Sequence, residues 1–237
     1  WSKTALAVVQ AIAEAIALQF FKQLVLNLTT LVAIPFNRKA IMKSINSICI
    51  YCGSSSGRLE AYGAVGCALA KALVSRNIRL IYGGAGIGIM GRVADEVLKL
   101  GGEAIGVIPK ALAHKEVAHK NLTQLHVTES MHERKMLMAE LSDGFIALPG
   151  GIGTLEELFE IWTWAQLGFH NKPCGLLNVE GYYDSLIVFL DHVLAEQFVK
   201  KEQRDLLIVE TNPEVLLDRY ANYQAPAVRK WVGKNET

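Results

Sequence analysis

Short, continuous apolar runs alternate along the chain with longer segments whose apolar residues recur at helical spacing. The first pair is 47–52, SICIYC, and 59–76, separated by a turn of glycine and serine. The same alternation predicts further strands over 78–82, 104–108, 122–127, 145–148, 174–179 and 206–209. It predicts further helices over 92–100, 130–141, 155–167, 182–198 and 213–220.

Continuous apolar strands linked by helices are typical of a parallel sheet that is covered on both faces, with right-handed crossovers. The sequence contains no linker, low-complexity segment or internal repeat between these elements. We therefore predict one α/β domain over 42–223: a single, doubly wound, Rossmann-like parallel sheet with helices on both faces. Residues 224–237 are expected to form a C-terminal tail.

The segment 1–41 differs from this pattern. It is apolar over 4–34, but Glu14 and Lys22 interrupt it, and its longest charge-free run has 15 residues. A spanning helix needs about 18–20 such residues. We interpret this segment as an N-terminal extension or an upstream translated segment, and we expect no membrane span.

Composition narrows the class of protein. Hydrophobic residues make up 51% of the 237 residues and charged residues 20%, which excludes a disordered chain. With a formal net charge of +1, no global field attracts nucleic acid or an anionic membrane. Four cysteines are too few for a secreted disulfide framework of this length, so we expect a cytoplasmic protein.

Three predicted strands end in glycine-rich loops that lead into helices: 53–57 (GSSSG), 83–91 (GGAGIGIMG) and 149–154 (PGGIGT). Ligands of doubly wound folds bind beyond the carboxyl ends of the strands. Glycine allows close approach of the backbone, and a helix N-terminus adds about half a positive charge. The loops therefore predict a phosphorylated small-molecule ligand.

The loop 53–57 also fits the G-x-S-x-G pattern of a nucleophile elbow. In an α/β-hydrolase, however, earlier strands build the oxyanion hole, whereas this loop follows the first predicted strand. A polar turn with an N-cap serine is the simpler structural alternative to phosphate binding.

Two further patterns have alternative interpretations. Residues 86–91 match G-x-G-x-x-G, but the nearest acid, Glu103, precedes the next strand instead of following it, which argues against a dinucleotide oxidoreductase. Cys49 and Cys52 form a C-x-x-C pair, yet the other cysteines are isolated and no histidine pair has ligand spacing. We predict buried strand cysteines and no metal site.

The loop 149–154 and the segment 130–135 contain the other candidate residues. Thr154-x-x-Glu157 matches a capping box, which explains both residues without any function but not the three glycines and the proline before them. The segment 130–135, SMHERK, places Arg134 and Lys135 where one predicted strand leads into the next unit. A solvated helix face is the alternative for this pair.

These segments carry a resemblance to a known family. The stretches 83–91, 131–135 (MHERK), 149–157 (PGGIGTLEE), 163–168 (TWAQLG) and 175–183 (GLLNVEGYY) resemble the LONELY GUY (LOG) family over most of 48–209. Its members are cytokinin riboside 5′-monophosphate phosphoribohydrolases, which cleave a purine nucleoside 5′-monophosphate into free base and ribose 5-phosphate. Ala85, often a glycine in the family, and the segment 1–41 depart from the family pattern.

The resemblance implies roles for individual residues. Glu157 stabilises the oxocarbenium-like transition state or acts as a base, kept ionised in the first helical turn by the helix dipole. Arg134 is the second catalytic residue and holds the leaving base or the sugar hydroxyls. The implied substrate-binding residues are Gly53, Ser54, Gly83, Gly84, Glu116, Arg134, Lys135, Gly150, Gly151, Gly153, Thr154 and Thr163.

The resemblance also implies a homodimer with active sites near the subunit interface, and no cofactor. The apolar segment 161–169 is one candidate for that interface, and core packing of Trp162 and Trp164 is the equal alternative. A non-catalytic nucleotide or cofactor carrier on the same fold is the main functional alternative. The name lysine decarboxylase, sometimes given to similar proteins, has little support, because no lysine is singled out for pyridoxal phosphate. Adenine and N6-prenylated adenine both remain possible as the preferred base.

Overall fold

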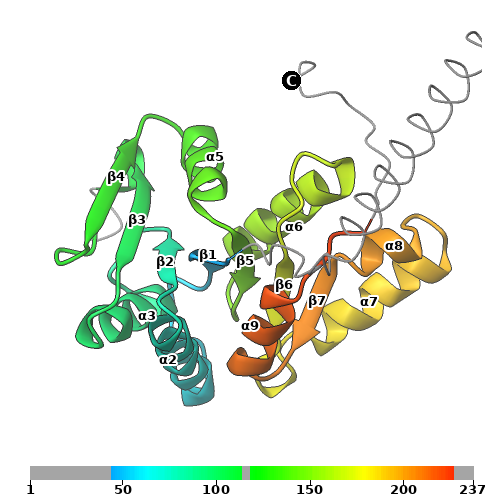
Figure 1. Ribbon diagram of the computed structural model, residues 1–237, viewed down its shortest axis with the longest axis horizontal. Helices are drawn as coiled ribbons and strands as arrows, with labels where there is room; N and C mark the ends of the chain where they lie inside the picture. The colour runs from blue at the N-terminus through cyan, green and yellow to red at the C-terminus, as the bar shows by residue number, and fades with distance from the viewer. Residues whose placement is uncertain (1–43, 114–117, 227–237) are drawn as a thin grey trace, which may run out of the picture. The chain divides into compact units, whose positions relative to one another are not determined.

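The computed structural model describes residues 44–113 and 118–226 (Figure 1). Backbone contacts divide the chain into two units, Trp1–Met42 and Lys43–Thr237, and every described residue belongs to the second. The extension expected over 1–41 and most of the tail expected over 224–237 lie outside the described residues.

The described unit contains a parallel seven-stranded sheet in the order β4-β3-β2-β1-β5-β6-β7, which confirms the predicted fold (Figure 1). The strands are β1 Ser47–Tyr51, β2 Arg79–Tyr82, β3 Ala104–Pro109, β4 Gln124–Thr128, β5 Gly144–Ala147, β6 Cys174–Leu177 and β7 Leu207–Glu210. From β1 the chain builds outward to β4 and then returns to β5 on the other side of β1. The carboxyl ends of β1 and β5 therefore flank the topological switch point.

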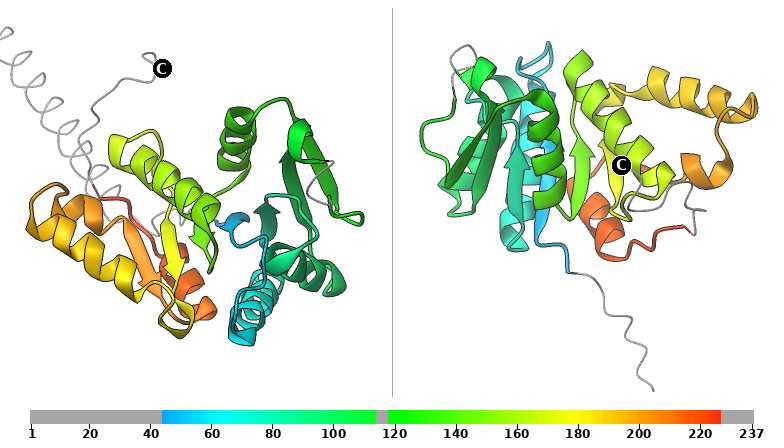
Figure 2. Two further views of the ribbon diagram at one scale, coloured as in Figure 1. Left: turned by 180° about the vertical axis from the view of Figure 1, so that it is seen from behind. Right: turned by 90° about the horizontal axis from the view of Figure 1, so that it is seen from above.

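Helices cover both faces of the sheet (Figure 2). One face packs against α2 (Glu60–Ser75), α3 (Gly88–Lys99) and α9 (Pro213–Ala221), and the other against α5 (Met131–Leu141), α6 (Ile152–Leu167) and α7 (Asp184–Ala195). The short helices α4 (Lys110–Ala113) and α8 (Lys201–Arg204) and the 3₁₀ turn η1 (Val179–Gly181) complete the set. Neither α4 nor α8 was predicted, because four residues cannot display a helical period.

Alternate residues of β1 enter the two cores. Ile48 and Ile50 belong to the core beneath α2, and Cys49 belongs to the core beneath α6. Cys52, just beyond the strand, lies in the same core as Ile48, so the two cysteines of the C-x-x-C pattern occupy opposite faces. All four cysteines are free. Both cysteines of this pair are buried as predicted, Cys49 within the strand and Cys52 just after it.

Within the residues that the structure describes, no helix is both long enough and apolar enough to cross a membrane.

Candidate active site

The three glycine-rich loops meet at the switch point between β1 and β5. The Gly53 amide donates to the Pro149 carbonyl at 3.1 Å, and the Ile89 amide donates to the Gly53 carbonyl, also at 3.1 Å. Gly88 has a φ of +61°, and a Cβ there would lie 2.3 Å from the Ser54 carbonyl carbon. Only glycine fits at this crossing, so the loops form one compact site.

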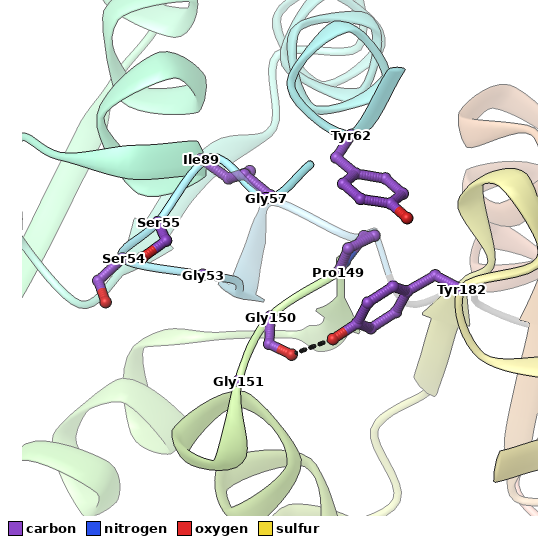
Figure 3. Close-up of a pocket in the computed structure, with 10 residues that line it drawn as sticks. All are labelled: Gly53, Ser54, Ser55, Gly57, Tyr62, Ile89, Pro149, Gly150, Gly151 and Tyr182. Atoms are coloured by element: carbon purple, nitrogen blue, oxygen red, sulfur yellow. Dashed lines mark hydrogen bonds between the residues drawn. The ribbon is translucent and has the colours of Figure 1, made fainter. Parts of the chain in front are cut away.

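A cavity of about 280 Å³ opens between these loops (Figure 3). Ser54 and Ser55 lie at one end of it, and the rings of Tyr62 and Tyr182 lie at the other (Figure 3). Its lining residues are Gly53, Ser54, Ser55, Gly57, Tyr62, Ile89, Pro149, Gly150, Gly151 and Tyr182. Sequence reasoning did not predict either tyrosine, although the second belongs to the GYY stretch at 181–183. No serine of 53–57 caps a helix, because α2 follows an N-cap at Leu59.

The prediction that Thr154 and Glu157 form a capping box is wrong. Helix α6 begins at Ile152 with Gly151 as its N-cap, so Thr154 is already the third helical residue. Glu157 lies in the second turn, and the first turn contains no acid. The expectation that a first-turn dipole keeps Glu157 ionised is therefore wrong as well, since that effect falls off within one turn.

The start of α6 leaves backbone donors available. The first helical hydrogen bond joins the Leu155 amide to the Gly151 carbonyl at 3.2 Å, so the preceding amides have no partner within the helix. A Cβ added at Gly151 or Gly153 would meet nothing within 4 Å. Packing within the described chain therefore does not require glycine at these two positions, and the backbone there is open to close approach.

Arg134 and Glu157 meet across α5 and α6. Ser130 caps α5 by accepting from the Glu133 amide at 3.2 Å, and Arg134 follows on the first turn. The Arg134 Nη2 lies 3.6 Å from the Glu157 Oε1, and both side chains are at least 85% buried. Their charges therefore interact in a medium far less polarisable than water.

Gly83 makes room for the arginine. A Cβ at this position would lie 2.3 Å from the Arg134 Nη2, so any other residue would displace the guanidinium. The Arg134 Nε is buried and has no hydrogen-bond partner among the described residues. A buried donor of this kind is costly unless it is satisfied, which suits it to an acceptor on a ligand.

The carboxylate of Glu157 also acts on the end of β1. Burial and, after it, the charge of Glu157 raise the pKa of the Cys49 and Cys52 thiols. Both thiols stay protonated and serve as core side chains.

Lys135 has partners within the protein. Its ammonium lies 2.6 Å from Glu156 and 2.9 Å from Glu160, both on α6. Burial alone would lower the pKa of Lys135, but its hydrogen bonds to these carboxylates outweigh burial and raise the pKa. Its role as a substrate contact stays a prediction.

The other predicted residues have separate positions. Gly84 adopts a φ of +78° and its carbonyl accepts from the His119 amide at 3.0 Å. Thr163 is exposed on α6, where its hydroxyl donates to the Phe159 carbonyl at 2.6 Å. Glu116 lies outside the described residues. Trp162 is buried and its indole N–H donates to the Gln203 carbonyl at 3.0 Å, so it packs in the core.

Seven of the predicted residues fall into two neighbouring groups. Gly53, Ser54, Gly150 and Gly151 line the cavity, and Gly83 lies with Arg134 and Glu157. Met90 connects the groups, because its amide donates to the Gly53 carbonyl and its sulfur lies near Gly83. Among the described residues, no group of three or more His, Cys, Asp or Glu side chains is placed to hold a metal ion.

Sequence comparisons find close relatives. A family model described as possible lysine decarboxylase matches residues 90–220. The probable cytokinin riboside 5′-monophosphate phosphoribohydrolase LOGL6 of Oryza sativa subsp. japonica is 47% identical over 74% of this chain and 70% of its own. Cytokinin riboside 5′-monophosphate phosphoribohydrolase LOG5 of Arabidopsis thaliana is 45% identical over 78% of this chain and 81% of its own.

Structural comparisons find the same fold in more distant proteins. The molybdenum cofactor binding protein of Rippkaea orientalis matches with a TM-score of 0.57 and 20% identity over 74% of this chain and 95% of its own. The Moco carrier protein of Chlamydomonas reinhardtii matches with a TM-score of 0.55 and 19% identity over 74% of this chain and 99% of its own. At these identities the similarity shows the fold alone.

Proposed function

Because the chain belongs to the LOG family, we propose that it is a phosphoribohydrolase that cleaves the N-glycosidic bond of cytokinin riboside 5′-monophosphates. The observation that carries this proposal is the buried pair of Arg134 and Glu157, 3.6 Å apart, beside three loops suited to a phosphate. A non-catalytic carrier needs the loops but has no use for the pair. Identity of 45% or more to phosphoribohydrolases also supports the enzyme over the carrier.

The 5′-phosphate binds at the start of α6. The Gly151 amide lies at the N-cap of α6, and the amides of Gly153 and Thr154 lie in its first turn. The helix dipole adds positive charge at this end of the helix. The open space over Gly151 and Gly153 admits the phosphate oxygens. Gly53 and Ser54 face this position from the loop after β1. The phosphate is bound by these nearby groups, because a protein with a net charge of +1 has no overall field that attracts anions.

Hydrolysis takes place beside the arginine and the glutamate. The bond between the ribose C1′ and the base nitrogen breaks with its electron pair going to the base, and water adds to C1′. The developing positive charge on the sugar is stabilised by Glu157, which also accepts the proton of the attacking water. Arg134 donates from its unsatisfied Nε to the sugar hydroxyls or to the leaving base. The leaving base takes up one proton, which balances the proton that Glu157 accepts from water and leaves Glu157 ionised again.

The geometry does not favour lysine decarboxylation. A Schiff base with pyridoxal phosphate forms from a neutral lysine amine. The lysine nearest the catalytic pair in sequence, Lys135, is held as an ammonium by Glu156 and Glu160, which raise its pKa. Lys135 is therefore unsuited to form a Schiff base.

The proposal includes a homodimer. Apolar side chains are exposed on β4 and α5, where Val127 is 51%, Met131 43% and Met136 50% accessible. A second copy covering such positions would remove apolar surface from water. Light scattering should give twice the 26.0 kDa of one chain, and a monomer mass would contradict the dimer.

The experiment that tests the function compares a nucleotide with its unphosphorylated riboside. The purified protein should release free base from AMP or from isopentenyladenosine 5′-monophosphate, and none from isopentenyladenosine, because the riboside cannot engage the start of α6. The ratio of the two nucleotide rates identifies the preferred base. Bound nucleotide without any base release would favour the carrier.

A further inference from the structure

The geometry points to Tyr182 as a positioning residue that orients the phosphate-binding loop after β5, an inference that rests on the proposed function. Its hydroxyl donates to the Gly150 carbonyl at 2.5 Å (Figure 3). The peptide group that joins Gly150 to Gly151 is planar and trans, so its carbonyl and its N–H point in opposite directions. By fixing this carbonyl, Tyr182 fixes the direction of the Gly151 amide at the N-cap of α6.

The whole loop is held through its carbonyl groups. The hydroxyl of the adjacent Tyr183 donates to the Leu148 carbonyl at 2.6 Å, and the Gly53 amide donates to the Pro149 carbonyl at 3.1 Å. With Tyr182 on Gly150, three consecutive carbonyls therefore have partners. The contacts on Pro149 and Gly150 also direct the amides of Gly150 and Gly151, which is the preorganisation that anion binding requires.

The turn that carries Tyr182 is strained. Glu180 has φ 50° and ψ 36°, and Gly181 has a φ of +67°, so two successive residues occupy the left-handed region. Such a conformation of a non-glycine residue costs about 1–3 kcal/mol and persists only where surrounding contacts impose it.

The contacts that impose this turn come from Asn178, whose side chain is buried. Its Oδ1 accepts from the Tyr183 amide at 2.8 Å, and its Nδ2 donates to Asp184 at 2.7 Å. Asn178 itself is anchored to β7 through its amide, which donates to the Glu210 carbonyl at 2.8 Å. A strained turn that Asn178 holds in place is consistent with a turn whose function is to position Tyr182 against Gly150.

The surroundings of Tyr182 show that its hydroxyl is not needed for the core. The side chain is 42% exposed, and its ring makes edge contacts with Tyr62 at 5.5 Å and Tyr183 at 4.9 Å between centroids. Phenylalanine keeps the ring and these contacts. The substitution Tyr182→Phe therefore removes the hydrogen bond to Gly150 and little else.

The test measures KM, kcat and binding of ribose 5-phosphate for Tyr182→Phe. The phosphate does not react, so a weaker phosphate loop weakens the substrate and the transition state alike. We expect KM for isopentenyladenosine 5′-monophosphate and Kd for ribose 5-phosphate to rise together by roughly three- to tenfold, as for one lost hydrogen bond. We expect kcat to stay within about twofold.

Tyr220→Phe is the matched control. Tyr220, on α9, also donates its hydroxyl to a backbone carbonyl, that of Phe145 on β5. Unlike Tyr182, it is buried in the hydrophobic core. Its loss should lower the temperature of unfolding and leave KM and Kd unchanged. A purely structural role for Tyr182 would give this same result.

Unchanged KM and Kd in folded Tyr182→Phe would overturn the inference, as would a loss confined to kcat. Failure of the proposed function has a different signature, because the wild-type protein would then release no base. In that case the calorimetric Kd for ribose 5-phosphate still compares the two variants. A wild-type protein that binds no ribose 5-phosphate would overturn the inference, because Tyr182 would then have no phosphate site to orient.

Discussion

At the residue scale, neighbouring glycines of the loop after β5 have different surroundings. A Cβ at Gly150 would lie 2.1 Å from the Thr154 hydroxyl and 2.9 Å from the Gly53 amide. A Cβ at Gly151 would meet nothing within 4 Å. The first glycine is therefore required by packing, and the second is free to serve a ligand.

This difference predicts opposite effects of the same substitution. Gly150→Ala should lower the free energy of unfolding by about 1–3 kcal/mol, because the added methyl group overpacks a buried contact. Gly151→Ala should change it by less than about 0.5 kcal/mol. It should still raise KM at least roughly tenfold, because the methyl group occupies the space of the phosphate.

Denaturant unfolding and steady-state kinetics on both variants check this prediction. If Gly151→Ala kept the wild-type KM, the start of α6 would not be the phosphate site. Equal stability of the two variants would show that the contact between Gly150 and Thr154 matters less than its geometry indicates.

Thr154 and Glu157 show the limit of local patterns at this scale. Their spacing matches a capping box, yet the helix begins two residues before Thr154 and both lie inside it. The predicted helix begins at residue 155, because glycines flank Ile152 on both sides and interrupt the helical pattern at the true start of α6. The local sequence does not distinguish a Thr and a Glu inside a helix from a capping box, because the two residues are three positions apart in either case.

At the scale of elements, apolar runs located the strands and most helices within a few residues. The errors fall where no apolar period exists, as at α4 and α8, and where a glycine loop turns directly into a helix, as at Gly88. The position of Tyr182 was beyond sequence reasoning, because it depends on two left-handed residues and the support of Asn178. The contact between α5 and α6 was equally hidden, since it depends on how both pack on one face of the sheet.

A histidine in the loop that follows α6, His170, predicts a pH dependence of stability. The Lys172 amide donates to the His170 Nδ1 at 3.1 Å, so the ring in its neutral form donates from Nε2 to the Ile161 carbonyl at 2.9 Å. Burial, with the nearby Lys172 charge, lowers the pKa of His170 from 6.5 to about 4. Protonation of the His170 Nδ1 would also break the hydrogen bond from the Lys172 amide, because two N–H donors would then face each other.

The unfolded chain therefore binds more protons than the folded protein between pH 6.5 and about pH 4. The contribution of His170 to stability is complete above pH 6.5 and is lost as the pH falls toward 4, up to roughly 3 kcal/mol. Urea unfolding of the wild type and of His170→Gln across this range measures it. The variant should show a flatter dependence, and parallel curves would exclude His170 as the cause.

At the scale of the whole molecule, the site is assembled from both halves of the sheet. The loops after β1 and β2 precede the switch back to β5, and the start of α6 follows it. Arg134 lies on α5, which connects β4 to β5, and Glu157 lies on α6, the first helix after β5. The pair of Arg134 and Glu157 therefore exists only in the folded domain, where Gly83 leaves the space for the guanidinium.

The roles proposed for Arg134 and Glu157 predict which single substitutions lower turnover most. Arg134→Ala and Glu157→Gln each remove one preorganised charge and should lower kcat by at least about a hundredfold. Glu156→Gln is the control, because it changes a neighbouring carboxylate of α6 that contacts Lys135 and not Arg134. Lys135 keeps Glu160 in this variant, so its kcat should stay near the wild-type value.

The most direct measurement is the initial rate of base release from isopentenyladenosine 5′-monophosphate by the wild type and these three variants, each shown to be folded by its thermal unfolding. A phosphoribohydrolase built on Arg134 and Glu157 predicts turnover by the wild type and Glu156→Gln, and a hundredfold or greater loss in the other two. Near wild-type rates in folded Arg134→Ala or Glu157→Gln would contradict the roles assigned to the pair. Absence of base release from the wild type would contradict the function itself.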